Sequence, residues 1–157
     1  MYKKILVCLD GSDLAETILP YAIEQTRRFE SNLILFRVFS ETPVISVAMP
    51  GMPGLPIETE GLEKRLAEEE RETENYLKSL VDKIRTETGL NVNYDKMLGV
   101  AGPAIIEFSN KHEIELIAIA THGRSGLGRV VLGSVADYVI RHSATPILLI
   151  RPGKNKS

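Results

Sequence analysis

The apolar residues of the chain gather in five short runs, separated by longer segments with a helical repeat. In two runs, residues 116–120 and 147–150, consecutive positions are all apolar. A strand with one solvent-exposed face would alternate apolar and polar residues, so we expect these two strands to be covered on both faces. The sequence predicts five strands, over residues 3–9, 32–39, 91–98, 115–120 and 146–151.

Four segments between the strands are predicted to be helical. The first covers residues 14–28 and contains Pro20. Because proline inside a helix costs about 3 kcal/mol, the regular helix should start near Thr17, with Pro20 in its first turn. The second covers residues 62–86 and has one mostly apolar stripe. This stripe consists of Leu62, Leu66, Thr73, Leu77, Leu80 and Ile84.

The last two predicted helices have recognisable start signals. The third begins at Pro103, since proline is favoured as the first helical residue, and continues to about Lys111. The fourth follows Ser134, with Asp137 three residues on as in a capping box, and ends near His142.

Strands and helices therefore alternate along a chain of 157 residues, a length that fits one domain, 1–157. The alternation predicts an α/β fold: a three-layer sandwich with a five-stranded parallel sheet, Rossmann-like, with right-handed crossovers. In such sheets ligands bind beyond the carboxyl ends of the strands, where the strand order reverses. We therefore look for a site in the loops after Leu9, Leu98 and Ala120.

The segment from about 40 to 60 interrupts this pattern. Residues 42–59 include four prolines and hardly any charge, so the segment is predicted to be a loop. Structureless loops of this length are uncommon in compact domains and are often functional. The alternatives of a lid, a subunit contact and an insertion without a role stay open.

Composition and charge exclude several classes of protein. A net charge of −2 does not favour a nucleic-acid partner. The chain has no apolar run near the roughly 18 residues of a membrane span and no leader after Met1, so we expect a cytoplasmic protein without membrane contact. Its single cysteine, Cys8, lies in an apolar run and is expected to be a buried thiol.

The strongest chemical signal is the glycine-rich segment 121–134, between a buried strand and a helix start. Glycines allow the backbone to approach a ligand closely, and a helix N-terminus offers free N–H groups and a positive dipole end. Phosphate is the expected ligand. Ser134 either donates its hydroxyl to that phosphate, caps the helix, or does both. Candidate ligand contacts in the segment are His122, Gly123, Arg124, Gly126, Arg129, Gly133 and Ser134.

Two common phosphate motifs do not fit the chain. A P-loop requires Lys and then Ser or Thr after its second glycine, whereas Gly128 is followed by Arg129 and Val130. A dinucleotide-binding fingerprint would follow the first strand, where the chain has the residues 10–13, Asp-Gly-Ser-Asp.

The segment resembles the ATP-binding signature of the universal stress protein family: glycine, two residues, glycine, nine residues, then glycine and Ser or Thr. Gly123 matches the second glycine, and Gly133 with Ser134 closes the motif. Ala120 stands at the first glycine position, which is a departure. Residues 4–12, 100–104 and 132–136 are also similar to segments of this family, so the resemblance spans nearly the whole chain.

This resemblance implies an adenine-nucleotide-binding protein with a fold like that of the adenine nucleotide alpha hydrolases. It implies ATP as ligand, with or without Mg, and a role in stress response. Asp10 would contact the adenosine, Val38 would offer backbone groups to adenine, and Gly123, Gly133, Ser134 and Val135 would hold the phosphates. It also implies a homodimer, for which the apolar fifth strand is a plausible edge.

The residues themselves leave alternatives for several of these roles. Asp10 before Gly11 also suits a local turn, and Val38 alone is indistinguishable from a core residue. Arg124 and Arg129 suit phosphate, or are solvated loop residues. Gly99 shapes the third strand–helix turn, with ligand contact as a secondary role.

The sequence favours a binding protein over an enzyme. Phosphoryl transfer needs metal ligands and a group that positions the nucleophile, and no carboxylate lies between residues 121 and 136. Slow ATP hydrolysis, an adenylating enzyme on the same fold, and a dimerisation module that binds no nucleotide remain as alternatives. The dimerisation module stays open because Ala120 replaces the first glycine of the ATP-binding signature.

Overall fold

The computed structural model describes residues 1–40, 59–121 and 132–152. Most of the proline-rich loop and five predicted ligand contacts lie outside these residues. In the described part, five parallel strands form one sheet in the order β3-β2-β1-β4-β5. The strands are β1 Lys4–Leu9, β2 Asn32–Phe39, β3 Val92–Leu98, β4 Leu116–Ala120 and β5 Ile147–Ile150. The predicted five-stranded parallel sheet is confirmed.

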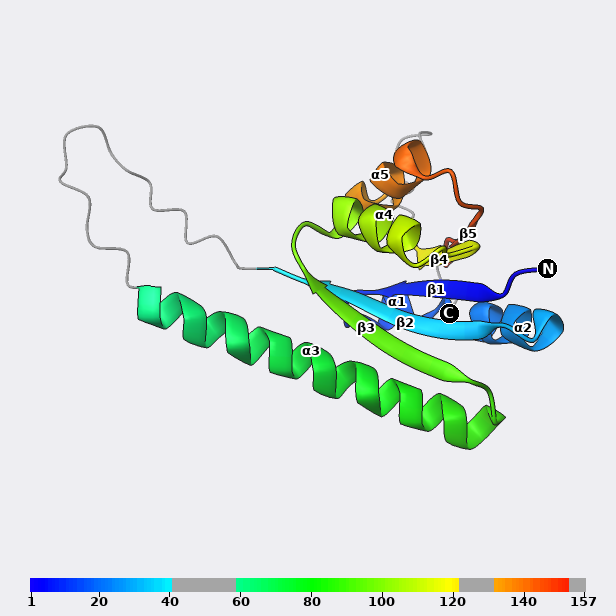
Figure 1. Cartoon of the computed structure of the whole chain (residues 1–157), viewed down its shortest axis with the longest axis horizontal. Coiled ribbons are helices and arrows are strands. Elements are labelled where there is room, and N and C mark those ends of the chain that lie inside the picture. Colours follow the sequence, from blue (N-terminus) through cyan, green and yellow to red (C-terminus); the bar gives the residue numbers. More distant parts are fainter. Residues whose placement is uncertain (41–58, 122–131, 153–157) are drawn as a thin grey trace, which may run out of the picture.

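Helices cover both faces of the sheet, which confirms the predicted three-layer α/β fold (Figure 1). On one face pack α1 Asp13–Glu16, α2 Leu19–Phe29 and α3 Thr59–Thr88. On the other pack α4 Ala101–Lys111 and α5 Ser134–His142. Residues 5 to 9 of the central strand β1 are all buried, because alternate side chains enter the two helix layers.

The two strands that were expected to be covered on both faces, β4 and β5, differ in burial. In β4 the first four residues are buried, as predicted. In β5 all four residues are only partly buried. The difference arises because β4 lies between two strands, whereas β5 pairs only with β4 and forms an edge of the sheet.

The first predicted helix is two helices. Ser12 caps the one-turn α1, with its Oγ accepting the Ala15 N–H at 3.1 Å, and α2 starts afresh at Leu19. Pro20 is the second residue of α2 and therefore lies in a first turn, as expected. A proline is tolerated there because the first N–H groups of a helix have no intrahelical partner.

The starts of α4 and α5 correct the sequence-based interpretation. Helix α4 begins at Ala101, two residues before Pro103, which is still within the first turn. The predicted capping box of α5 is wrong, since Gly133 is the N-cap and no side chain caps the helix. Asp137 instead pairs with Arg141, Oδ2 to Nε at 2.9 Å.

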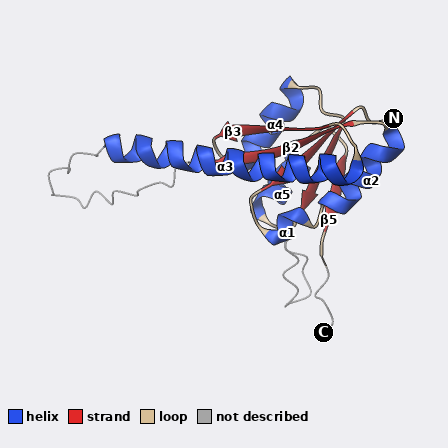
Figure 2. Ribbon diagram, turned by 90° about the horizontal axis from the view of Figure 1, so that it is seen from below, coloured by secondary structure: helices blue, strands red, loops and turns tan. Residues whose placement is uncertain are grey.

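Helix α3 is longer than predicted and extends beyond the sheet (Figures 1 and 2). Its 30 residues span about 45 Å, whereas the eight residues of β2 span about 26 Å. Leu77, Val81 and Ile84 are buried against the sheet. Glu69 Oε1 lies 3.4 Å from the backbone N of Ser40, just after β2, so earlier residues of α3 pass the strand ends.

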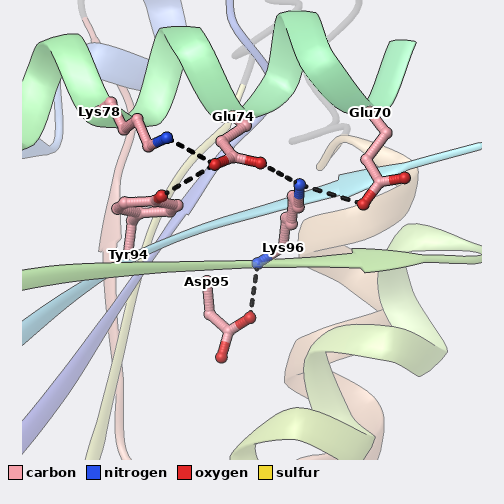
Figure 3. A network of polar contacts seen from close by, with 6 residues as sticks. All are labelled: Glu70, Glu74, Lys78, Tyr94, Asp95 and Lys96. Atoms are coloured by element: carbon pink, nitrogen blue, oxygen red, sulfur yellow. Dashed lines mark hydrogen bonds and ion pairs between the residues drawn. The ribbon is translucent and has the colours of Figure 1, made fainter. Parts of the chain in front are cut away.

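A polar network fixes α3 to the edge strand β3 (Figure 3). Lys96 Nζ lies 2.5 Å from Glu74 Oε2 and 3.0 Å from Glu70 Oε1. Lys78 Nζ lies 2.6 Å from Glu74 Oε1, which also accepts the Tyr94 hydroxyl at 3.3 Å. The hydrogen bonds from Lys78 and Lys96 lower the pKa of Glu74 to about 2, so the carboxylate of Glu74 is ionised at neutral pH.

Within the described residues, no helix combines the length and the apolar content that a bilayer crossing requires.

Candidate functional site

A pocket opens where the strand order reverses, beyond the carboxyl ends of β1 and β4. This is the position at which open α/β sheets bind ligands. Its volume is about 250 Å³. Its lining residues are of two kinds. We call the apolar residues on the α4 and α5 side of the sheet, Phe36, Val38, Ile105 and Ile119, the apolar wall. We call Asp10, Thr121, Gly133 and Ser134, which follow β1 and β4 or begin α5, the polar end.

The structure brings together six of the residues predicted from the sequence. These line the pocket: Asp10, Val38, Ala120, Gly133, Ser134 and Val135. Gly99 is not among the lining residues, whereas Ala101, the first residue of α4, is. Gly99 has φ of +153° and shapes the turn between β3 and α4. The other predicted contacts lie outside the described residues: His122, Gly123, Arg124, Gly126 and Arg129.

Ala120, at the first glycine position of the motif, has an ordinary strand backbone. It is the last residue of β4 and pairs with Ile150 of β5. Among the described non-glycine residues, only Glu30 and Glu113 have positive φ. The departure from glycine therefore strains nothing here, because this position needs no left-handed conformation.

The turn after β1 is held by Asp10. Its Oδ1 accepts the N–H of Ser12 at 2.9 Å and the hydroxyl of Ser12 at 2.6 Å, while Gly11 adopts a φ of +86°. The local-turn interpretation of Asp10 is thus confirmed. The carboxylate remains exposed at the pocket, so its role toward a ligand stays a prediction.

Three residues that the sequence analysis missed position helix α1. The hydroxyl of Tyr76 donates to Glu16 Oε1 at 3.0 Å, and the Arg37 guanidinium lies 5.4 Å from the centre of the Tyr76 ring. Burial, and then the bond to Glu16, raises the pKa of Tyr76. Arg37 packs so tightly on Gly11 that a Cβ there would lie 2.9 Å from its guanidinium nitrogen. These contacts tie α1, which lines the pocket through Ala15, to α3.

Thr121 connects the end of β4 to the start of α5. Its Oγ1 accepts the Gly133 N–H at 2.8 Å, and its own N–H donates to the carbonyl of Ile150 at 2.9 Å. Gly133 has an ordinary φ of −60°. A Cβ at Gly133 would lie 3.2 Å from Thr121 Oγ1, so this close approach favours glycine, whereas its backbone angles do not.

The N-terminus of α5 lies at the polar end of the pocket. The Gly133 N–H is occupied by Thr121, which leaves the N–H groups of Ser134, Val135 and Ala136 without intrahelical partners. All three residues line the pocket. Because Ser134 does not cap the helix, its hydroxyl is free of that role. Together with the helix dipole, these groups suit an anion.

Phe36 of the apolar wall stacks on Phe108 of α4, with ring centroids 4.3 Å apart. Cys8 also lines the pocket, and burial raises the pKa of its thiol to about 12, so it is a neutral apolar group. A pocket lined by apolar side chains and by free helix N–H groups suits a base that carries phosphate.

Comparisons with known proteins agree with this architecture. The model of the Universal stress protein family matches residues 1–151. Universal stress protein MJ0531 of Methanocaldococcus jannaschii is 30% identical over 158 residues, covering 99% of this chain and 86% of that protein.

Solved structures share the fold. Universal stress protein UspA from Lactobacillus plantarum superposes with a TM-score of 0.76 at 24% identity, covering 96% of this chain and 98% of that one. A universal stress protein in complex with cAMP gives a TM-score of 0.65 at 19% identity, covering 96% of this chain and 97% of that one. The family model spans nearly the whole sequence and a relative of 30% identity covers it, so the chain belongs to the universal stress protein family.

Proposed function

We propose that the protein binds ATP in the pocket between β1 and β4 and acts as a regulatory module in stress response. The observation that carries this proposal is the pairing of an apolar wall with the N-terminus of α5 at the point where the strand order reverses. Adenine packs on the wall formed by Phe36, Val38 and Ile105, and Val38 offers its backbone groups to the base edge. Asp10 contacts the ribose.

The phosphates lie at the other end of the pocket. The N–H groups of Ser134, Val135 and Ala136 and the Ser134 hydroxyl hold them. No Lys or Arg is among the described residues that line the pocket. In this proposal Arg124, Arg129 and a Mg ion that accompanies ATP supply the positive charge that the phosphates need. The universal stress protein that shares this fold and was solved in complex with cAMP supports an adenine nucleotide as the class of ligand.

We propose binding without efficient turnover. Asp10 is the one carboxylate among the described lining residues, and its Oδ1 already accepts two hydrogen bonds from Ser12. Phosphoryl transfer requires groups that position a nucleophile and hold metal as well as the phosphates. The expectation of a cytoplasmic location stays a prediction.

Titration calorimetry of nucleotide-stripped protein with Mg-ATP tests the proposal. We expect saturable binding of about one ATP per chain, weakened about a hundredfold or more by Gly133→Asp. The new Cβ would lie 3.2 Å from Thr121 Oγ1, and the new carboxylate would repel the phosphates. Gly61→Asp is the matched control, because it adds the same charge at a position of α3 with no atoms within 4 Å of a Cβ.

The same samples, incubated with ATP for hours and assayed for ADP and phosphate, test the absence of turnover. Wild-type protein that does not bind at millimolar ATP would contradict the proposal. If Gly133→Asp left the affinity for ATP unchanged, the proposed position of the phosphates at the N-terminus of α5 would be wrong.

We propose in addition that β5 pairs with a second copy of the chain to form a homodimer. β5 is an apolar edge strand with every side chain partly exposed. The opposite edge strand, β3, carries Asp95 and Lys96, and Asp95 Oδ1 occupies the N–H of Lys96 at 2.8 Å. Charged residues discourage edge pairing, so β5 is the better template.

Leu149→Pro is expected to convert the dimer to a monomer in light scattering after size exclusion. The carbonyls of Pro146 and Ile150 accept hydrogen bonds from β4. Successive residues of a strand direct their backbone groups to opposite sides, so the N–H of Leu149, next to Ile150, faces away from β4. Proline at position 149 has no N–H and cannot donate to a second strand there. Leu149→Ala keeps this N–H and should remain dimeric. A dimer in Leu149→Pro would contradict pairing through β5, while a dimer without ATP binding would favour the alternative of a pure dimerisation module.

A further inference from the structure

We propose that Thr121 is a positioning residue of the nucleotide pocket, acting through the hydrogen bond between its Oγ1 and the Gly133 N–H. We call this bond the latch. Its consequence for nucleotide affinity rests on the proposed function, whereas its existence does not.

The latch joins two elements that are not neighbours in sequence. Thr121 directly follows β4, and Gly133 directly precedes α5, twelve residues later. Thr121 is 3% exposed, and its own N–H is bound to the carbonyl of Ile150 at the end of β5. The start of α5 is therefore tied, through one side chain, to the carboxyl ends of two strands.

The latch decides which backbone donors face the ligand. It occupies the Gly133 N–H, so that the next three N–H groups form the anion-binding end of the pocket. It also favours the glycine, because a Cβ at position 133 would lie 3.2 Å from Thr121 Oγ1 and crowd it. Donors that are fixed before binding lower the ordering cost that the ligand must overcome.

A hydroxyl is needed for this role. In Thr121→Val the side chain keeps its shape, but the part-buried Gly133 N–H loses its acceptor. In Thr121→Ser the acceptor oxygen is kept and only a methyl group is lost. The two variants therefore separate the hydrogen bond from side-chain packing.

Two measurements test the proposal. Amide exchange of the nucleotide-free protein, followed by NMR, should show a Gly133 N–H that is protected in wild type and Thr121→Ser and unprotected in Thr121→Val. Calorimetry should show that ATP binds about tenfold more weakly to Thr121→Val, the loss expected for one hydrogen bond, and that Thr121→Ser restores the affinity.

Thr26→Val is the matched control. It removes a buried hydroxyl that donates to the Ala22 carbonyl at 2.8 Å in α2, away from the pocket lining, and should leave ATP affinity unchanged. Wild-type affinity in Thr121→Val, or weak binding in Thr121→Ser as well, would overturn the positioning role. An unprotected Gly133 N–H in wild type would overturn the latch itself. If wild type does not bind ATP, the proposed function fails, and the exchange experiment still decides whether the latch forms.

Discussion

Replacing Phe36 with alanine is expected to lower the free energy of unfolding by about 3 to 5 kcal/mol. Phe36 lies in β2, is 1% exposed and stacks on Phe108 of α4. The substitution removes the ring that joins the sheet to the α4 layer and leaves a cavity that its stacked partner cannot fill. Urea unfolding followed by circular dichroism measures the loss.

Tyr21→Ala is the matched control for this prediction. Tyr21 is also aromatic but is 52% exposed on α2, so its loss should cost about 1 kcal/mol or less. Phe36→Leu should fall between the two. If Phe36→Ala cost no more than Tyr21→Ala, the ring would not be part of the core as the structure describes it.

Replacing Gly102 with alanine is expected to lower the free energy of unfolding by about 1 to 3 kcal/mol, although alanine favours helices over glycine by about 1 kcal/mol. A Cβ at Gly102 would lie 2.6 and 2.7 Å from two ring carbons of Tyr138. Helices α4 and α5 would have to separate to admit it. The shift of the urea midpoint measures the effect.

Gly61→Ala should act in the opposite direction. Gly61 is also helical, in α3, but nothing lies within 4 Å of its Cβ position, so alanine should be neutral or stabilise by up to about 1 kcal/mol. Adding Tyr138→Ala to Gly102→Ala removes the two nearest ring carbons and should recover part of the loss. Equal effects of alanine at Gly102 and Gly61 would contradict the close packing of α4 on α5.

Local patterns were sufficient to predict most elements. The runs of β1 and β4 are apolar at consecutive positions, and these strands are buried on both faces, so a short window of sequence was enough to predict them. The same pattern in β5 predicted the strand but not its partial exposure, which follows from its place at the sheet edge. The glycine-rich segment after Ala120 likewise indicated a ligand site at a strand end, because glycine and a helix start act through their own backbone.

Helix ends were less predictable. Ser134 and Asp137 have the spacing of a capping box, yet α5 starts after Gly133. At this helix start, Thr121 Oγ1 accepts the Gly133 N–H across twelve residues of sequence. A capping rule considers only neighbours along the chain, so it does not include such a long-range acceptor.

The sequence by itself determined the order of the strands and of most helices and pointed to the family, and it predicts which loop binds phosphate. Only the tertiary structure decided what forms the pocket. Phe36, Ile105 and Cys8 meet because β1 lies between β2 and β4, and Glu16 meets Tyr76 across 60 residues. Backbone propensities act over a few residues, whereas these contacts follow from strand order and helix packing, which no local pattern contains.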